Sequence, residues 1–96
     1  MNRAKTANHH QKRVTFELAA DREAEVFLAG TFNAWMPQKQ RLSDKGGNGI
    51  YSCTLALTPG IYEYKFKVND TWLVDVNNPN FAQNYLGSLN SVIVVQ

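Results

Sequence analysis

The most regular pattern in the chain is the strict alternation of apolar and charged residues over positions 62–68. A period of two is typical of a β-strand that is half buried against a core, and no segment shows the spacing of three and four that a helix needs. The fold is therefore expected to consist of strands. In this strand Tyr62, Tyr64, Phe66 and Val68 would face the core, and Glu63, Lys65 and Lys67 would face water.

Other short apolar runs, separated by turn-forming residues, predict the remaining strands. Turns are expected at residues 44–49, at Thr58-Pro59-Gly60 and at Asn69-Asp70. About seven short strands without a helix predict an all-β, immunoglobulin-like β-sandwich. Besides 62–68, the expected strands are residues 14–18, 26–29, 51–57, 71–75 and 92–95, with a weaker one near Leu42.

The 96 residues suffice for one domain, which we expect at residues 12–96 behind a disordered N-terminal tail at residues 1–11. Four of the ten cations lie in the first thirteen residues, so the rest of the chain holds six cations against eight acids. A folded part with a net charge of −2 argues against a nucleic-acid partner, because such partners are bound mainly through their phosphates. No apolar run approaches the roughly 20 residues of a membrane span, so no membrane partner is expected.

A cytoplasmic location is expected for two reasons. The first eleven residues contain no apolar stretch of the kind that a secretory signal needs. Cys53 is the single cysteine, so it cannot form the internal disulfide that is common in small secreted domains. The strand pattern favours Cys53 as a small buried hydrophobic residue rather than a nucleophile.

No catalytic, metal or cofactor site is expected. Both histidines, His9 and His10, lie in the expected tail, so neither a nucleophile–histidine pair nor a zinc cluster can be built in the body of the chain. Asp70 and Asp75 could form the carboxylate pair of a glycosidase. Turns and strand ends also collect solvated aspartates for structural reasons, and this interpretation is favoured.

The two tryptophans are the strongest candidates for binding. Trp35 follows the strand at 26–29 through a turn, where it is either exposed or closes the end of the sandwich. Trp72 shares the parity of Val74 and Val76, which favours the core, although it directly follows a turn. Exposed indole rings suit sugars, because sugar rings have apolar C–H faces and hydroxyl rims. Polar contacts could come from Lys65, Asn84, Ser88 and Asn90, which are equally plausible as ordinary solvated residues.

Five short motifs in the same order resemble the glycogen-binding module, carbohydrate-binding module family 48. This family occurs in the β subunit of AMP-activated protein kinase and beside the catalytic domains of branching and debranching enzymes. The resemblance covers residues 25–95. Its motifs are Gly30-Thr31-Phe32-Asn33-Ala34-Trp35 with Pro37, Pro59-Gly60, Tyr64-Lys65-Phe66, Val68-Asn69-Asp70-Thr71-Trp72 and Asn84-Tyr85-Leu86-Gly87-Ser88-Leu89-Asn90.

The resemblance implies an early-set immunoglobulin-like sandwich that binds α-glucans such as glycogen or starch-derived maltooligosaccharides without catalysis. It implies that Trp35 and Trp72 stack on glucose rings and that Lys65 hydrogen-bonds to hydroxyls. Trp72 would then be exposed, against its parity. The late loop implies that Leu86 reaches over or through the sugar chain and that Ser88 and Asn90 hydrogen-bond to it.

The chain departs from the family pattern at two of these places. Ser88 stands where kinase-type members often carry threonine, which keeps the hydroxyl but removes a methyl group. Asn69-Asp70 replaces a turn in which glycine commonly follows the acidic residue.

An α-glucan is the expected partner, and the resemblance also admits a glycogen- or starch-metabolising enzyme or a kinase. The main alternative is a protein-interaction or scaffolding domain of the same fold, since a fold does not determine function. Retention of both tryptophans, Lys65 and Asn90 favours the sugar, because exposed tryptophans serve little purpose on a surface that binds nothing.

Overall fold

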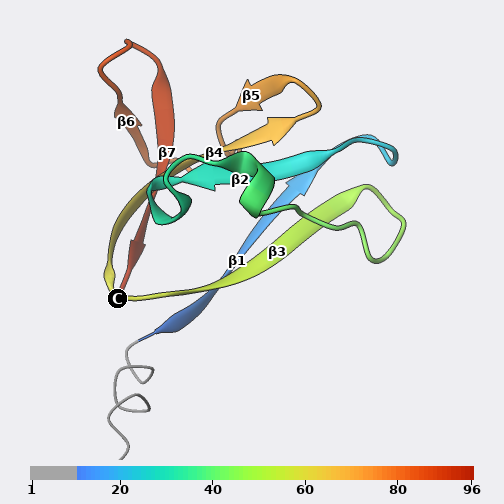
Figure 1. The fold of residues 1–96 in the computed structure, drawn as a ribbon, viewed down its shortest axis with the longest axis horizontal. Coiled ribbons are helices and arrows are strands. Elements are labelled where there is room, and N and C mark those ends of the chain that lie inside the picture. Colours follow the sequence, from blue (N-terminus) through green and yellow to red (C-terminus); the bar gives the residue numbers. More distant parts are fainter. Residues whose placement is uncertain (1–10) are drawn as a thin grey trace, which may run out of the picture.

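The computed structural model describes residues 11–96, which form seven strands and two single-turn 3-10 helices (Figure 1). The expected all-β class and strand number are confirmed. The expected tail at residues 1–11 lies, apart from Gln11, outside the described residues. The described part contains no helix that is long and apolar enough to cross a membrane. The elements are β1 (Lys12–Ala19), β2 (Val26–Gly30), η1 (Thr31–Asn33), η2 (Pro37–Lys39), β3 (Ile50–Leu57), β4 (Gly60–Val68), β5 (Thr71–Leu73), β6 (Phe81–Gln83) and β7 (Leu89–Val95).

The strands form two antiparallel sheets that pack as a sandwich. One sheet pairs β1 with β3, and Phe16 lies opposite Cys53 in its register. The other sheet has the order β2-β4-β7-β6, and β5 pairs with part of β4. Its register places Leu28 opposite Phe66 and Tyr64 opposite Ser91. β4 is thus the central strand, with neighbours on both edges.

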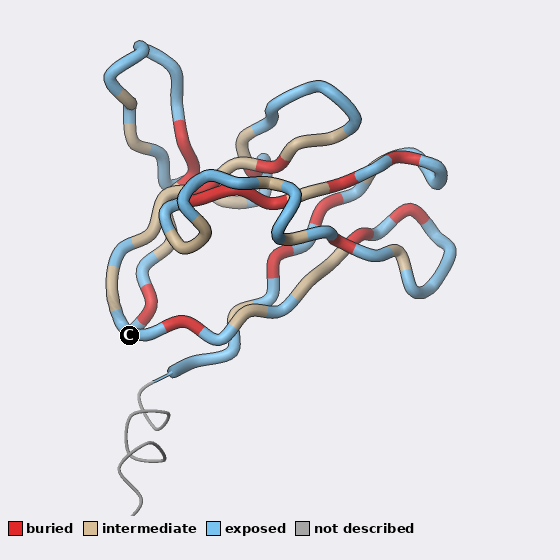
Figure 2. Tube along the Cα trace, in the orientation of Figure 1, coloured by how far each residue is buried: buried red, intermediate tan, exposed pale blue. Residues whose placement is uncertain are grey.

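Alternate residues of the strands form the core between the sheets. Phe16 of β1 meets Tyr64 of β4 edge to face, with ring centroids 4.9 Å apart, and Tyr64 meets Phe66 in the same way at 5.9 Å. Figure 2 shows buried segments on strands of both sheets and exposed hairpin ends. The alternation expected for residues 62–68 is confirmed, so Lys65 and Lys67 lie on the outer face of β4.

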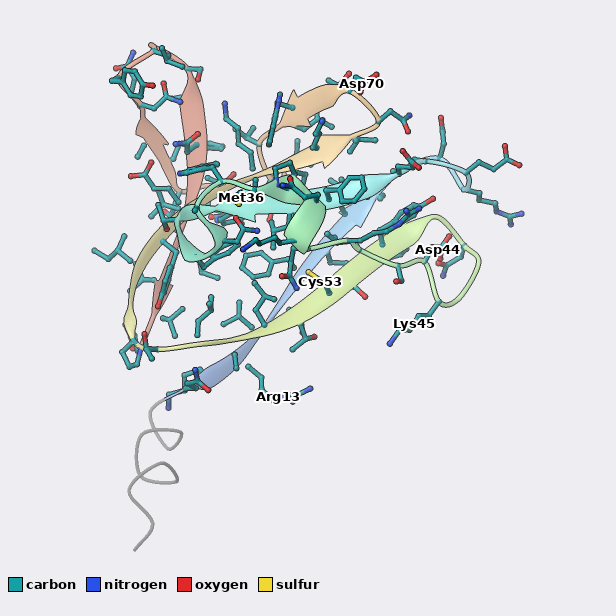
Figure 3. All side chains as sticks on the ribbon, in the orientation of Figure 1. Arg13, Met36, Asp44, Lys45, Cys53 and Asp70 are labelled. Carbon is teal, nitrogen blue, oxygen red and sulfur yellow. The ribbon has the colours of Figure 1, made fainter. Side chains whose placement is uncertain are left out.

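Cys53 lies on β3 between the two sheets, where it packs against the core and is half buried (Figure 3). Desolvation by this burial raises the pKa of its thiol to about 11. A thiol that stays protonated near neutral pH is a poor nucleophile. The position agrees with the expectation of a small hydrophobic residue, although burial is partial.

A buried polar cluster ends β5 earlier than expected. The Tyr64 hydroxyl donates to Asp75 Oδ2 at 2.8 Å, and the Asp75 backbone N–H donates to Ser91 Oγ at 2.7 Å. Burial, with a smaller contribution from Asp75, raises the pKa of the Tyr64 hydroxyl well above its usual value. Because Asp75 turns inward to make these bonds, the strand expected at residues 71–75 stops at Leu73. The expectation of a solvated Asp75 is wrong.

Two other strand predictions need correction. No strand forms at Leu42, because Arg41 bridges to Phe27 of one sheet while Ser43 bridges to Ser52 of the other. The segment crosses between the sheets and buries Leu42 on the way. β6 was not predicted, because it follows a run of turn-forming residues at 77–80 and is only three residues long.

Candidate functional site

A groove of about 740 Å³ lies on the outer face of the five-stranded sheet. Three segments build it: the turn after β2, the β4–β5 hairpin and the β6–β7 hairpin. Figure 1 shows both hairpins projecting from the same side of the molecule, with η1 and η2 near their bases. The groove contains the six residues that the resemblance implied for glucan binding, together with Asn84, which was considered as a further polar contact. Its lining residues are Thr31, Trp35, Glu63, Lys65, Trp72, Gln83, Asn84, Tyr85, Leu86, Ser88 and Asn90.

The turn after β2 presents Trp35 to the groove. The Gly30 N–H donates to Asn33 Oδ1 and Asn33 Nδ2 donates to the Leu28 carbonyl, both at 3.0 Å. This arrangement closes the turn, and the Trp35 N–H then donates to the Gly30 carbonyl at 2.9 Å. Ala34 and Trp35 both have left-handed backbone angles, with φ of 55° and 59°, which is a strained conformation for residues other than glycine. The strained turn leaves Trp35 37% exposed.

Trp72 lies on β5, opposite Lys67 of β4. The Lys67 Nζ atom is 5.8 Å from the centroid of the indole ring, within cation–π range. The indole is 44% exposed, so the core position favoured by parity is wrong and the exposure implied by the resemblance is confirmed. The alternation of residues 72, 74 and 76 misleads here because β5 ends at Leu73, one residue after Trp72. No core forms on the face of β5 that carries Trp72.

The expected Asn69-Asp70 turn leads into β5. Asn69 has a φ of 53°, and its side-chain Oδ1 accepts a hydrogen bond from the Glu25 N–H at 3.0 Å. An asparagine tolerates this left-handed conformation, so the turn closes without glycine. The turn therefore holds β5 against β4, where it carries Trp72.

Polar residues of β4 and β7 form the floor of the groove. Lys65 is half buried, and its Nζ donates to Ser88 Oγ at 3.2 Å. Asn90 is 5% exposed, and its Nδ2 donates to Glu63 Oε1 at 2.9 Å. Since Glu63 accepts from one end of the amide, it fixes which way the Asn90 side chain points. Fixed donors and acceptors on the floor are suited to a ligand rich in hydroxyl groups.

The loop between β6 and β7 is organised by Asn84. Its Oδ1 accepts hydrogen bonds from the Leu86 N–H at 3.0 Å and the Ser88 N–H at 3.2 Å. Its Nδ2 donates to Ser88 Oγ at 2.8 Å and to Asn90 Oδ1 at 3.4 Å. The loop turns at Gly87, where φ is +85°. With its own polar groups occupied in this way, the loop presents Leu86 to solvent, 75% exposed.

Four lining residues were not assigned to the site from the sequence: Thr31, Glu63, Gln83 and Tyr85. Glu63 could have been found, because it shares the outer face of β4 with Lys65. Tyr85 lies inside a motif of the resemblance, but no role came with it. Thr31 accepts a hydrogen bond from the Glu63 N–H at 3.3 Å, a contact between distant segments that spacing does not reveal.

The aspartates considered as a glycosidase pair do not lie in the groove. Asp75 is buried beside Tyr64, and Asp70 lies at the exposed end of the β4–β5 hairpin (Figure 3). Over residues 11–96 no three histidine, cysteine or acidic side chains come together as a metal site would require. What the groove offers chemically is exposed aromatic and aliphatic surface beside fixed hydrogen-bonding groups.

A second hollow, of about 500 Å³, lies at residues 21–24 beside Asn69. Its lining is charged and polar apart from Ala24, and it includes no aromatic side chain. It therefore lacks the combination of ring surface and hydrogen-bonding groups found in the groove.

Comparison with known proteins identifies relatives of this chain. Residues 12–96 match the family model for the glycogen recognition site of AMP-activated protein kinase. Over 72 residues the chain is 45% identical to Protein PTST homolog 2, chloroplastic, of Arabidopsis thaliana and 36% identical to Protein FLOURY ENDOSPERM 6, chloroplastic, of Oryza sativa. It is 35% identical to the human 5'-AMP-activated protein kinase subunit beta-1 over the same length.

Each of these matches covers 75% of this chain, but 13% of either plant protein and 25% of the human subunit. The chain thus corresponds to a small part of these relatives. A solved structure, the maltogenic amylase from S. marinus, superposes with a TM-score of 0.74 over 90% of this chain and 14% of the amylase. At 20% sequence identity this similarity supports the fold alone.

Proposed function

The chain belongs to the family of the glycogen recognition site of AMP-activated protein kinase, and on that premise we propose that it is a non-catalytic domain that binds α-glucan chains in the groove. Glycogen and starch-derived maltooligosaccharides are the proposed ligands. Trp35 and Trp72 are the proposed stacking platforms, with Leu86 against the sugar chain. Hydrogen bonds to hydroxyl groups would come from Lys65, Ser88 and Asn90.

The observation that carries the proposal is the convergence of these six residues. They come from β4, β5, β7 and two loops, yet all of them line one groove. Both indoles are more than a third exposed, whereas Asn90 is buried with its amide orientation fixed. This combination of apolar platforms and preset polar groups matches the two kinds of surface on a glucose ring.

The expected affinity is modest. Covering half of an indole removes on the order of 100 Å² of apolar surface from water, which contributes about 2.5 kcal/mol before ordering costs. Two platforms and several hydrogen bonds then correspond to a Kd in the micromolar to millimolar range, roughly −4 to −8 kcal/mol. Such affinity suits a polymer, because neighbouring sites on one glucan keep the effective concentration high.

The proposal extends to partners and location. A glycogen- or starch-metabolising enzyme or a kinase is the proposed protein partner, and the kinase subunits among the relatives support this choice. The expected cytoplasmic location stays a prediction.

The test is a titration of the isotope-labelled protein with maltoheptaose and β-cyclodextrin, followed through backbone amide and tryptophan indole signals. Saturable shifts should centre on Trp35, Lys65, Trp72 and the 86–90 loop. Trp35→Ala and Trp72→Ala should remove the sugar-induced shifts, while the rest of each spectrum should remain that of a folded protein. Absence of shifts at millimolar sugar would refute the proposal and favour the scaffolding alternative.

The salt dependence of binding distinguishes a glucan ligand from a nucleic-acid ligand. Binding of a neutral glucan should change little when the salt concentration rises from roughly 0.05 M to 0.5 M, whereas binding to phosphates weakens steeply. A steep salt dependence of any observed binding would therefore indicate contacts between phosphates and the side chains of Lys65 and Lys67.

A further inference from the structure

Tyr85 is the most exposed large hydrophobic side chain of the described residues, at 95%. It lies in the loop between β6 and β7 and lines the groove. An aromatic ring in this position gains almost nothing from the core, so its removal should cost the fold little. Its surface is available to a ligand in the groove.

The backbone that carries Tyr85 is held in place on both sides. The Asn84 N–H donates to the Ser88 carbonyl at 2.8 Å, and the Gly87 N–H donates to the Asn84 carbonyl at 3.0 Å. The Leu86 N–H is bound by the Asn84 side chain. Ser88 is in turn hydrogen-bonded to Lys65 on the floor. A ligand that covers Tyr85 therefore orders mainly one side chain and not a whole loop, which keeps the entropic cost low.

The position of Tyr85 differs from that of the other groove residues. Lys65 and Asn90 form the floor and are half or fully buried, whereas Tyr85 stands in the exposed loop of a projecting hairpin. In the proposed binding mode, a short ligand held by the floor and the tryptophans would leave the Tyr85 ring in solvent. A longer chain would continue past the floor and cover the ring.

We propose that Tyr85 is a third aromatic subsite, which extends the groove and makes binding favour longer α-glucan chains. The inference rests on the proposed glucan-binding function. Tyrosine supplies a flat ring for the apolar face of a glucose unit and a hydroxyl that can bond to its rim. The subsite contributes only when the chain is long enough to reach it.

The experiment compares the affinities of maltotriose and maltoheptaose for four forms of the protein by isothermal calorimetry. Tyr85→Ala should weaken maltoheptaose about five- to tenfold and change maltotriose by less than about twofold. Tyr85→Phe keeps the ring and should stay within about twofold of the unmodified protein for both sugars. Ile61→Ala is the matched control, since Ile61 is 72% exposed but does not line the groove.

The outcomes separate this inference from the proposed function. If the unmodified protein binds neither sugar, the proposed function fails. If it binds both and Tyr85→Ala leaves both affinities unchanged, the groove binds glucan but the third subsite is refuted. An equal loss for both sugars would also refute it, because Tyr85 would then act by shaping the loop.

Discussion

At the scale of single residues, Asn84 makes the largest indirect contribution to the groove. Its side chain accepts hydrogen bonds from the Leu86 and Ser88 N–H groups and donates to Ser88 Oγ and Asn90 Oδ1. Asn84→Ala should release the loop, lower stability by about 1 kcal/mol and weaken maltoheptaose about five- to tenfold. Faster hydrogen exchange of the Leu86 and Ser88 amides, measured by NMR, would identify the loop as the cause.

The conservative variant Asn84→Asp provides the control for this prediction. It keeps the oxygen that accepts from the Leu86 and Ser88 amides and loses the two amide donors. Its affinity and exchange rates should fall between those of the unmodified protein and Asn84→Ala. Unchanged exchange in Asn84→Ala would show that the loop is held by its backbone alone.

Cys53 provides a second prediction at the residue scale. Burial raises the pKa of the Cys53 thiol from its usual 9.0 to about 11, so the thiolate fraction near pH 8 is about a hundredfold lower than in an unfolded chain. Reaction with Ellman's reagent at pH 8 should therefore be at least about a hundredfold slower in the native protein than in guanidinium. Equal rates in the two states would contradict the burial of this thiol.

The sign of the pH dependence follows from the same shift. Because the folded pKa of Cys53 is raised, its contribution to stability is complete below about pH 9 and is lost as the pH rises towards 11. Tyr64 acts in the same direction, since its folded pKa is raised as well. Ionisation of these two groups therefore lowers the free energy of unfolding at alkaline pH, and neither group lowers it at acidic pH.

Residue types predicted the binding groups better than residue spacing did. Trp35, Lys65 and Asn90 could be proposed because aromatic and amide groups suit sugars, and the structure places them in one groove. Spacing misplaced Trp72, because parity applies only within a strand that continues past the residue. The glucan roles of these residues remain predictions until the titration is made.

At the scale of elements, the end of β2 links the sheet to the Trp35 turn. A Cβ atom on Gly30 would lie 2.5 Å from the Glu63 carbonyl oxygen of β4 and 2.7 Å from the ring of Phe32. The carbonyl belongs to a paired strand and cannot move aside at low cost. The absence of a side chain at Gly30 therefore allows the close approach of β2, η1 and β4.

Gly30→Ala should accordingly destabilise the protein by about 1–3 kcal/mol, the usual cost of overpacking, and weaken glucan binding by displacing Trp35. Denaturant unfolding followed by tryptophan fluorescence measures the first effect, and the maltoheptaose titration measures the second. Gly46→Ala is the matched control, because its Cβ would lie 3.5 Å from the nearest atom, on the Asn48 side chain. A loss for Gly46→Ala as large as that for Gly30→Ala would contradict this explanation.

The long alternating strands were predictable from the sequence, whereas β6 and the segment around Leu42 were not. β1, β3 and β4 each span eight or nine residues, which is enough for a period of two to stand out. β6 spans three residues, and its pairing with β7 depends on tertiary contacts that no local pattern encodes. The strand predicted near Leu42 does not form for a different reason. Leu42 is buried as expected of a strand residue, but its two neighbours pair with different sheets.

At the scale of the whole molecule, the sandwich separates stability from binding. The buried rings and the Tyr64–Asp75 cluster lie between the sheets, whereas the groove lies on the outer face of the larger one. Trp35, Trp72 and Tyr85 can therefore be exposed without weakening the core. The central strand β4 serves both purposes, with Tyr64 and Phe66 inward and Glu63 and Lys65 outward.

This separation predicts how ligand binding changes the unfolding of the whole domain. If the Kd for maltoheptaose is about 1 mM, then about 10 mM sugar stabilises the native state by about 1.4 kcal/mol through mass action. For a domain of this size the Tm should rise by about 6 to 10 °C, which differential scanning calorimetry resolves easily. Cellohexaose, a glucose oligomer with β-linkages, should give almost no shift at the same concentration. Trp72→Ala should remove the maltoheptaose shift while keeping its own Tm close to that of the unmodified protein, because the lost indole lies outside the core. Equal shifts with both sugars would instead indicate a general effect of the sugar on the solvent, and would contradict a site that recognises the α-linked chain.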